Sequence, residues 1–301
     1  MRVLITGATG LVGDAIVRLC KQRGYTVHYL TTRKDKIKNE DTIKGFYWNP
    51  KTQEVDNNCL DGIDAVINLA GASIAKRWTN AYKNEILQSR VQSVQLLHKL
   101  LLENKHQIKT VVSASAIGLY PSSLSAVYDE TSTVKNDSFL GKVVSAWEVE
   151  IDKLHSLNIT ICKLRIGIVL SKNGGALEKM TSPIRAGFGA SLGSGKQYQS
   201  WIHETDLAHL FLFSTEHGLS GVYNAVNSNP VTNRVMTKAI AKQLKKPLWL
   251  PNIPGFIIKL IVGEMATLAF ESQNVSNAKI LKKGFVFRYN TLEKALQDCL
   301  S

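Results

Sequence analysis

The sequence lacks any apolar run long enough to cross a membrane. Such a span needs roughly 18 to 20 uninterrupted apolar residues. The most apolar late segment, residues 256–262 (FIIKLIV), is short and is interrupted by Lys259. The amino terminus also lacks the basic region and small-residue cleavage site of a secretory signal, because an apolar segment begins there at once. We therefore expect a cytoplasmic protein without a membrane partner.

Cysteine is scarce and is not spaced in pairs. Four cysteines occur without a CxxC motif, so the spacing suggests neither a zinc site nor a disulfide framework. We expect no metal and interpret these cysteines as packing residues, which are Cys20, Cys59, Cys162 and Cys299.

Acidic residues are also few, with 24 Asp and Glu against 37 Lys and Arg, which gives a net charge of +13. A basic balance raises the possibility of a nucleic-acid partner. The basic residues are distributed along the chain, however, and residues 34–44 (KDKIKNEDTIK) are interrupted by acids. We interpret the excess mainly as a solvated surface with some attraction for anionic ligands, and we expect no specific nucleic-acid partner.

The first thirteen residues, MRVLITGATGLVG, contain the most informative pattern. An apolar run at residues 3–5 is typical of a strand buried on both faces of a parallel sheet. Gly7, Gly10 and Gly13 follow at every third position, and residues 14–23 have helical spacing. The sequence thus predicts a strand, a glycine turn and a helix whose N-terminus offers N–H groups to a pyrophosphate.

The TGxxGxxG spacing resembles the short-chain dehydrogenase/reductase superfamily, in particular its extended and atypical members. Further motifs in the same order cover essentially the whole chain, and they are NLAGASIAKRW, SASAIGLY, the Trp147-Glu148 pair, LRIGIVL, GSGKQYQSWIHETDL and residues 254–264. Together they resemble the NAD-dependent epimerase/dehydratase-like family. The branch is often labelled nucleoside-diphosphate-sugar epimerase or cell-division inhibitor.

The expected fold is α/β, a Rossmann doubly wound parallel sheet with a smaller C-terminal substrate-binding region. We assign residues 1–170 to the dinucleotide-binding domain, with a strand at 221–226 returning to it, and residues 171–301 mainly to the substrate region. The remaining expected strands lie at 25–30, 46–50, 63–69, 110–114 and 160–170. The expected helices lie at 80–103, 236–244, from 255 onward and at 291–300.

Arg33 follows the second expected strand, where an acidic residue would hold the ribose of NAD. A guanidinium there suits a 2′-phosphate, so Arg33 favours NADP over NAD. The alternative is that Arg33 and Lys34 are only loop charges. In the superfamily an NxAG segment lies against the nucleotide, and Asn68, Ala70 and Gly71 match it, although Asn68 also suits a purely structural buried amide. The expected cofactor-binding residues are Gly7, Thr9, Gly10, Leu11, Val12, Gly13, Arg33, Asn68, Ala70 and Gly71.

The resemblance places the catalytic hydroxyl on Ser115, with Ser113 as the alternative on the same face of the strand. The family's chemistry depends on a YxxxK pair in the following helix. Here those positions hold Leu140 and Val144. The remaining candidates for proton transfer are Lys142, Tyr120 and Tyr128, or a water.

Four residues are candidates for substrate contact. Arg77 and Trp78 suit an anionic or ring-bearing substrate, or else they precede and cap the helix at 80–103. The segment around Trp201 and His203 resembles part of the family's substrate pocket. Trp201 also suits packing, and a lone histidine such as His203 is more often structural.

Two hypotheses follow. In the first, the protein is an NADP-dependent epimerase or oxidoreductase acting on a sugar nucleotide or another small carbonyl or hydroxyl compound. In the second, it is a dinucleotide-binding sensor or regulatory protein with little or no catalysis, as the missing YxxxK pair indicates. A homodimer is compatible with both, because the apolar segment 258–268 suits either a cover for the substrate cleft or a dimer contact.

Overall fold

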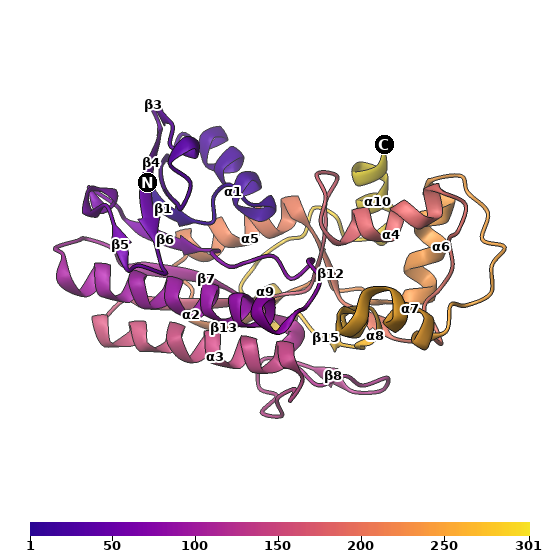
Figure 1. Ribbon diagram of the computed structural model, residues 1–301. Coiled ribbons are helices and arrows are strands. Elements are labelled where there is room, and N and C mark those ends of the chain that lie inside the picture. Colours follow the sequence, from indigo (N-terminus) through magenta and orange to yellow (C-terminus); the bar gives the residue numbers. More distant parts are fainter.

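A nine-stranded, mostly parallel sheet forms the centre of the computed structural model, which describes residues 1–301 (Figure 1). In spatial order its strands are β13 (Gly221–Ala225), β9 (Thr160–Ile166), β7 (Thr110–Ala116), β6 (Ala65–Asn68), β1 (Arg2–Thr6), β2 (Thr26–Thr31), β4 (Ile43–Asn49) and β3 (Asn39–Glu40), with β5 (Glu54–Val55) paired to β4. Only β3 and β5 run antiparallel to their neighbour β4. The α/β Rossmann-type fold expected from the sequence is confirmed.

Two pairs of helices cover the two faces of this sheet. Helices α1 (Leu11–Gln22) and α5 (Glu204–Glu216) pack together on one face, and α2 (Asn80–Glu103) and α3 (Phe139–Lys153) pack together on the other (Figure 1). Side chains fix where two of these helices begin, since Thr79 caps α2 and Ser138 caps α3. Because both faces are covered, the central strands are largely buried, as in residues 3–6 of β1.

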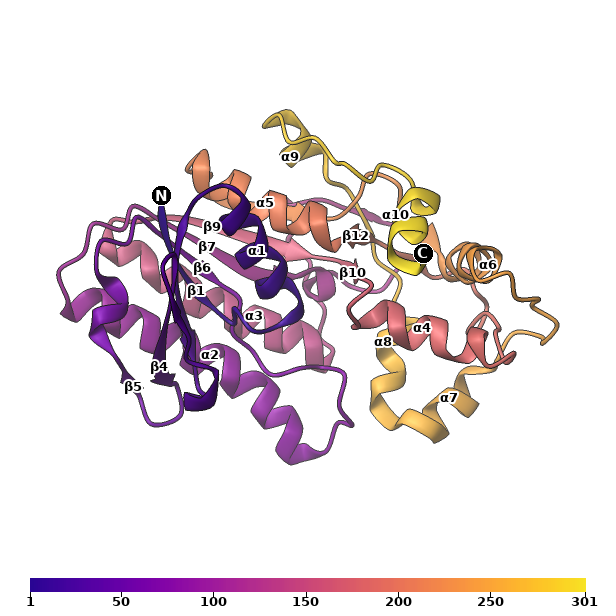
Figure 2. The same cartoon turned by 90° about the horizontal axis from the view of Figure 1, so that it is seen from above.

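A smaller lobe, built mainly from residues 168–203 and 227–301, lies beyond the carboxyl ends of the strands (Figures 1 and 2). Its helices are α4 (Ala176–Arg185), α6 (Asn233–Gln243), α7 (Gly255–Val262), α8 (Thr267–Phe270) and α10 (Leu292–Leu300), whereas α9 (Ala278–Lys282) packs against β13 at the edge of the central sheet. Its short strand pairs are β10 (Ile168–Leu170) with β12 (Trp201–His203), β11 (Tyr198–Gln199) with β14 (Val231–Thr232), and β15 (Asn274–Val275) with β8 (Val127–Tyr128). The lobe has its own apolar core around Trp201, Leu177 and Met236.

The sequence predicts one strand at residues 160–170, but the structure has two strands there. The apolar run at 160–170 breaks at Gly167, so that β9 stays in the central sheet while β10 joins the lobe. A Cβ atom at Gly167 would overlap the carbonyl of Ser200, so a side chain does not fit at the crossing. Hydrophobicity alone does not reveal this break, because apolar residues continue on both sides of Gly167.

Short 3-10 turns complete the chain. They are η1 (Lys34–Lys36), η2 (Asn57–Leu60), η3 (Ile117–Leu119), η4 (Leu154–Leu157) and η5 (Gly263–Ala266). The η5 turn and α8 reach back from the lobe to the sheet unit, where Met265 and Leu268 pack against the cluster around Trp78. An ion pair between Lys83 and Glu264 joins the same two parts. The segment thus bridges the two parts of the molecule.

Candidate functional site

A chain of hydrogen bonds joins the carboxyl ends of three neighbouring strands. The Thr6 hydroxyl donates to Oδ1 of Asn68 at 2.7 Å, and Nδ2 of Asn68 donates to the Ser113 hydroxyl at 2.9 Å. The Thr6 oxygen also accepts the backbone N–H groups of Leu69 and Ala70, at 3.0 and 3.1 Å. Asn68 is fully buried, so it supports the Leu69–Ala70 segment from inside the protein.

The glycine turn between β1 and α1 is built from close backbone contacts. Gly7 has a φ of +73°, and a Cβ atom there would lie 3.0 Å from the carbonyl carbon of Leu69. A Cβ atom at Gly13 would overlap the Gly7 carbonyl oxygen and lie 2.7 Å from the Cα atom of Ala8. Both positions require glycine, and together they press α1 close to the end of β1.

The N-terminus of α1 carries free amides. Its N-cap is Gly10, which has no side chain to accept a hydrogen bond, and Thr9 beside it is exposed. The first helical hydrogen bond runs from the Asp14 amide to the Gly10 carbonyl at 2.8 Å. The amides without an acceptor are those of Leu11, Val12 and Gly13. With the positive end of the helix dipole, they form an anion-binding turn.

Arg33 lies directly after β2, which neighbours β1 in the sheet. Its guanidinium is exposed and holds Asp35 through two bonds, Nε to Oδ1 at 3.1 Å and a terminal nitrogen to Oδ2 at 2.6 Å. A guanidinium that binds a carboxylate through two hydrogen bonds in this way can bind a phosphate in the same geometry.

Arg90 is a site residue that the sequence reasoning missed. It lies in α2 next to Gly71. A Cβ atom added to Gly71 would come within 3.1 Å of the Arg90 side chain. Its guanidinium donates to the carbonyls of Ala72 and Ile86, at 3.1 and 2.9 Å, and packs over the ring of Trp147. No carboxylate pairs with it, and burial lowers its pKa to about 10. A lone arginine within a helical pattern gives no signal of this position.

Ser115 and Glu148 meet on the α3 side of the sheet. The Ser115 hydroxyl donates to Oε1 of Glu148 at 2.6 Å, and Arg165 of β9 holds both carboxylate oxygens, at 2.8 and 2.9 Å. Burial alone would raise the pKa of Glu148, but the hydrogen bonds and charge of Arg165 outweigh it and keep the pKa below its usual value. All three side chains are buried.

The two other catalytic candidates lie elsewhere. Tyr120 is fully buried; its hydroxyl donates to Asn224 at 2.8 Å and accepts from Arg165 at 2.9 Å. Burial raises the pKa of Tyr120. Lys142 is exposed on α3 and lines a shallow groove against α2, away from the helix face that carries Glu148. The structure therefore does not bring Lys142 or the Tyr120 hydroxyl to a free position beside Ser115.

The expected YxxxK positions are filled by apolar packing. Val144 is buried, and Leu140 packs with Phe139 and Trp78. Trp78 itself donates its Nε1 proton to the Ile74 carbonyl at 2.9 Å. Of the two substrate candidates Arg77 and Trp78, only Arg77 is exposed.

The other two substrate candidates belong to the lobe interior. Trp201 is completely buried, and its Nε1 donates to the Asn229 carbonyl at 2.9 Å. His203 is 2% exposed and its ring stacks on Tyr289, with ring centroids 3.7 Å apart. Both side chains therefore pack inside the lobe, and their expected contact with the substrate stays a prediction.

His203 also lies near Asp298 and Cys299, three side chains of types that bind metals. Its Nδ1 accepts the Thr205 amide at 3.1 Å and so caps α5, which places the ring proton of neutral His203 on Nε2. Nε2 faces Asp298 at 3.3 Å. Burial lowers the pKa of His203 to about 4 and raises that of Cys299 to about 12. His203 is thus neutral at physiological pH, and its Nδ1 is engaged in capping α5.

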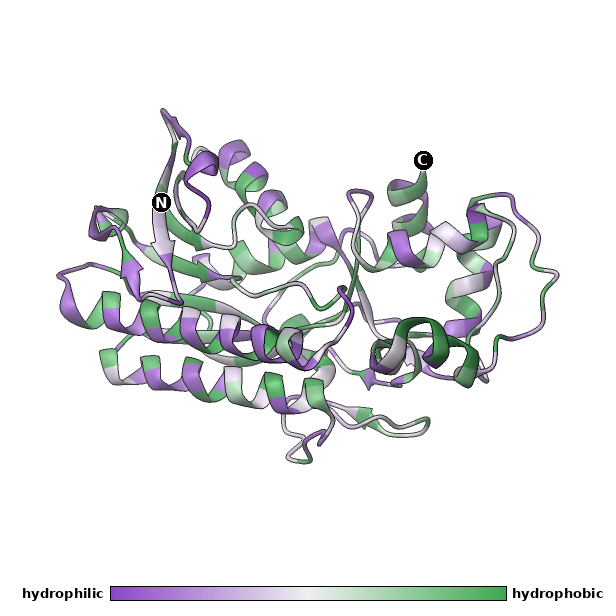
Figure 3. Cartoon of the chain, in the orientation of Figure 1, coloured by the Kyte–Doolittle hydropathy of each residue, from purple (hydrophilic) through white to green (hydrophobic).

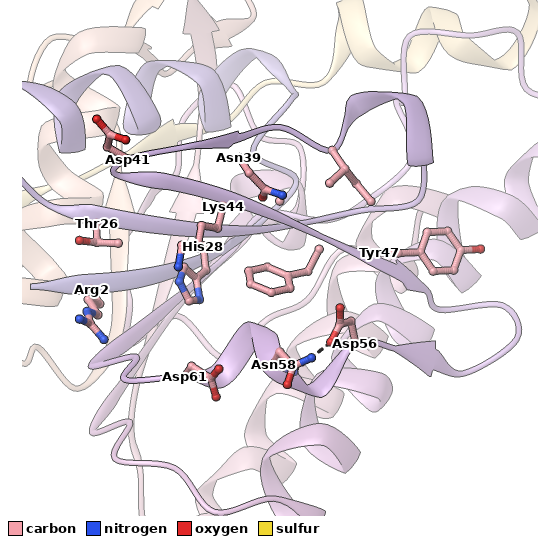
Figure 4. Close-up of a pocket in the computed structure, with 13 residues that line it drawn as sticks. Arg2, Thr26, His28, Asn39, Asp41, Lys44, Tyr47, Asp56, Asn58 and Asp61 are labelled. Atoms are coloured by element: carbon pink, nitrogen blue, oxygen red, sulfur yellow. Dashed lines mark hydrogen bonds between the residues drawn. The ribbon is translucent and has the colours of Figure 1, made fainter.

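A cavity of about 720 Å³ lies at the opposite end of the sheet (Figure 4). Arg2 and Thr26 line it at the amino ends of β1 and β2, and Asp56, Asn58 and Asp61 lie across from them. It is therefore separate from the glycine turn, which lies at the carboxyl ends of the strands.

None of the helices is long and apolar enough to cross a membrane.

Residues 3–227 match the model of the NAD dependent epimerase/dehydratase family, and residues 253–299 match a domain of unknown function, DUF1731. An epimerase family protein of Staphylococcus epidermidis is 36% identical over 302 residues, which cover 99% of each chain.

Two solved structures are also similar. The human epimerase family protein SDR39U1, solved with NADPH, is 28% identical, with a TM-score of 0.84 over 99% of both chains. A nucleoside-diphosphate sugar epimerase of Corynebacterium glutamicum is also 28% identical, with a TM-score of 0.77 over 98% of this chain and 57% of that one.

Proposed function

Since this chain belongs to the NAD dependent epimerase/dehydratase family, we propose that it binds NADP(H) and acts on a sugar nucleotide or another small carbonyl or hydroxyl compound. The observation that carries the proposal is the turn between β1 and α1, where Gly7 and Gly13 leave no room for side chains and three amides lack acceptors. A pyrophosphate fits this turn by charge, by shape and by the number of donors.

Three parts of the chain would hold the cofactor. The amides of residues 11–13 would bind the pyrophosphate, and Arg33 would bind the 2′-phosphate once its fork turns from Asp35. The small residues Ala70 and Gly71 would leave space at the strand ends. The NADPH in the human relative supports the same choice of cofactor. A bound nicotinamide would supply or accept the hydride.

Ser115 would position the reacting oxygen of the substrate. Because its proton is donated to Glu148, the Ser115 oxygen is left to accept a hydrogen bond from a substrate hydroxyl. The low pKa of Glu148 keeps that carboxylate ionised, so Ser115 stays in this orientation. With Lys142 on the outer face of α3 and Tyr120 engaged on both sides, we assign the proton transfer to a water.

Arg90 supports an anionic substrate. Two carbonyls take hydrogen bonds from one guanidinium nitrogen, which leaves Nε and the other terminal nitrogen as donors. A charge without a carboxylate partner beside Gly71 favours a phosphate or carboxylate on the bound molecule. This is the type of group that a sugar nucleotide carries.

The second candidate function is a dinucleotide-binding sensor with little or no catalysis. The apolar packing of Leu140 and Val144 favours it, since the usual tyrosine and lysine are replaced by core residues. Both candidates share the cofactor site and differ only in turnover.

Calorimetric titration with NADPH and NADH tests the shared part, and a panel of sugar nucleotides and small carbonyl compounds then separates the two candidates. We expect NADPH to bind more tightly than NADH and at least one compound to change the NADPH absorbance. Binding without turnover would favour the sensor, and no binding of either nucleotide would refute both.

A further inference from the structure

Helix α7 exposes apolar side chains to solvent along one side. Leu260 is 86% exposed and Phe256 is 73% exposed, and Ile257 and Ile261 are exposed beside them. Spacings of one, four and five residues place these four side chains on one face. Figure 3 shows α7 as hydrophobic along its length at the edge of the lobe. The helix is therefore apolar on the side that faces away from the protein as well.

A second pair of exposed aromatic side chains lies in the same lobe. Trp249 is 66% exposed, and its Nε1 donates to the Gly187 carbonyl at 3.0 Å. This bond holds Trp249 against the loop that carries exposed Phe188. An indole anchored by its N–H, with its ring in solvent, has the amphipathic form that suits a membrane–water interface.

The lobe around these side chains contains no acidic residue over long stretches. Residues 179–203 and 227–263 lack Asp and Glu entirely. They include α4 from Lys179 onward and all of α6 and α7, which gather at one end of the molecule (Figures 1 and 2). The basic residues of these stretches are exposed and belong to no ion pair, and they are Lys179, Arg185, Lys196, Arg234, Lys238, Lys242, Lys245, Lys246 and Lys259.

We propose that this end of the lobe docks on an anionic lipid bilayer, with α7 lying in the interface and Trp249 beside it. An apolar helix face in a lobe with a large excess of basic residues matches both parts of such a surface, the acyl chains and the acidic headgroups. With eight residues, α7 is too short to span the bilayer, so the contact is peripheral. This inference does not depend on the proposed function, and it departs from our expectation that the protein has no membrane partner.

Two other occupants fit the surface less well. A second copy of the chain would bring two predominantly basic surfaces together, and their like charges would repel. A nucleic acid would use the positive charge but not Ile257, Leu260 and Ile261, because bases stack on aromatic rings rather than on branched aliphatic groups. The combination of aliphatic side chains and basic charge favours lipid.

Sedimentation of the full-length protein with vesicles tests the proposal. We expect it to bind vesicles of phosphatidylcholine mixed with phosphatidylserine, to bind vesicles of phosphatidylcholine alone much less, and to be released by high salt. The double variant Phe256→Ser/Leu260→Ser should lose at least about tenfold in vesicle affinity. Lys245→Glu/Lys246→Glu should weaken the binding to the anionic vesicles only.

A matched control removes exposed apolar side chains elsewhere. Leu102 and Val286 are 64% and 83% exposed and lie outside the two acid-free stretches, so Leu102→Ser/Val286→Ser should leave vesicle binding unchanged. Thermal melting of every variant checks that the fold is intact. The fluorescence of Trp249 should shift to shorter wavelength on the anionic vesicles, and Trp249→Phe should remove that shift.

Several results would overturn the proposal. They are the absence of binding to the anionic vesicles, equal binding to both vesicle types, and equal loss in the α7 and control variants. A dimer in sedimentation velocity that Leu260→Ser dissociates, without vesicle binding, would assign the surface to a second copy. Binding to a single-stranded oligonucleotide that the same variants abolish, again without vesicle binding, would assign it to nucleic acid.

Discussion

Ser115 donates its hydroxyl proton to Glu148 over 2.6 Å, and this bond links strand β7 to helix α3. Ser115 and Arg165 are also direct register partners in β7 and β9. Glu148 is thus held from two neighbouring strands at once, and the orientation of the Ser115 hydroxyl is fixed before any ligand arrives.

Ser115→Ala should abolish turnover and leave the cofactor site intact. We expect kcat to fall at least about a hundredfold, because the substrate oxygen loses its positioning contact. The affinity for NADPH, measured by calorimetry, should stay the same. Ser113→Ala serves as the comparison, and a loss of turnover in that variant alone would move the role to Ser113.

Glu148→Ala should destabilise the protein by about 3 to 5 kcal/mol, because Arg165 would then be a buried charge without its partner. Urea denaturation at neutral pH measures the change in the free energy of unfolding. Glu148→Gln keeps acceptor and shape but not charge, and it should fall between the wild type and the alanine variant. Wild-type stability in Glu148→Ala would show that Arg165 finds another partner.

Arg33→Ala should lower the affinity for NADPH by tenfold or more, which corresponds to about 1.5 to 3 kcal/mol for a lost charged hydrogen bond. The affinity for NADH should change little. Asp35→Asn is a second test, because Arg33 binds the Asp35 carboxylate in the absence of NADPH. In this variant Arg33 does not have to break an ion pair before it binds the 2′-phosphate. That variant should bind NADPH more tightly than the wild type. Equal losses for both nucleotides in Arg33→Ala would argue against a 2′-phosphate contact.

Gly13→Ala should destabilise the protein by about 1 to 3 kcal/mol and weaken binding of both nucleotides, because the new Cβ atom overlaps the Gly7 carbonyl. Thermal melting and calorimetric titration measure the two effects. Gly255→Ala in α7 meets only ordinary contacts, 3.5 Å or more away, and should bind both nucleotides as the wild type does.

His203 should make the protein less stable in mild acid. Burial lowers its pKa to about 4 in the folded chain from the ordinary value of 6.5, so the unfolded chain takes up a proton that the folded chain does not bind. Its stabilising contribution is complete above pH 6.5 and is lost as the pH falls toward 4, by about 3 kcal/mol in total. His203→Asn retains an acceptor for the Thr205 amide. Between pH 7 and pH 4.5 it should therefore lose less stability than the wild type in urea denaturation.

The glycine turn and the order of the elements follow from local sequence, which explains why the fold was predictable. The helix expected at 80–103 has these bounds in the structure, and Gly7 and Gly13 occupy the close contacts that their spacing indicates. Local pattern does not reveal which polar groups meet across the sheet. Asn68 meets Thr6 and Ser113 over long sequence separations, and Tyr120 meets Asn224 in the same way.

The surroundings of the substrate candidates were also hard to predict, because they depend on contacts between residues far apart in the sequence. Trp201 and His203 stand beside family-like motifs, but only the three-dimensional packing of the lobe shows that it buries them. Arg90 is the opposite case, because it belongs to none of the motifs. It looks like one more basic residue of α2 in the sequence, and only the fold places it beneath Gly71 without an acidic partner.

The edge strand β13 completes the central sheet only after the chain has passed through α4, β12 and α5. During synthesis, β9 therefore leaves the ribosome about fifty residues before the strand that covers its open edge. Until then its backbone groups are free to pair with another nascent chain. Ribosome-bound chains that end before Gly221 would thus be the stage at which this protein most needs a chaperone.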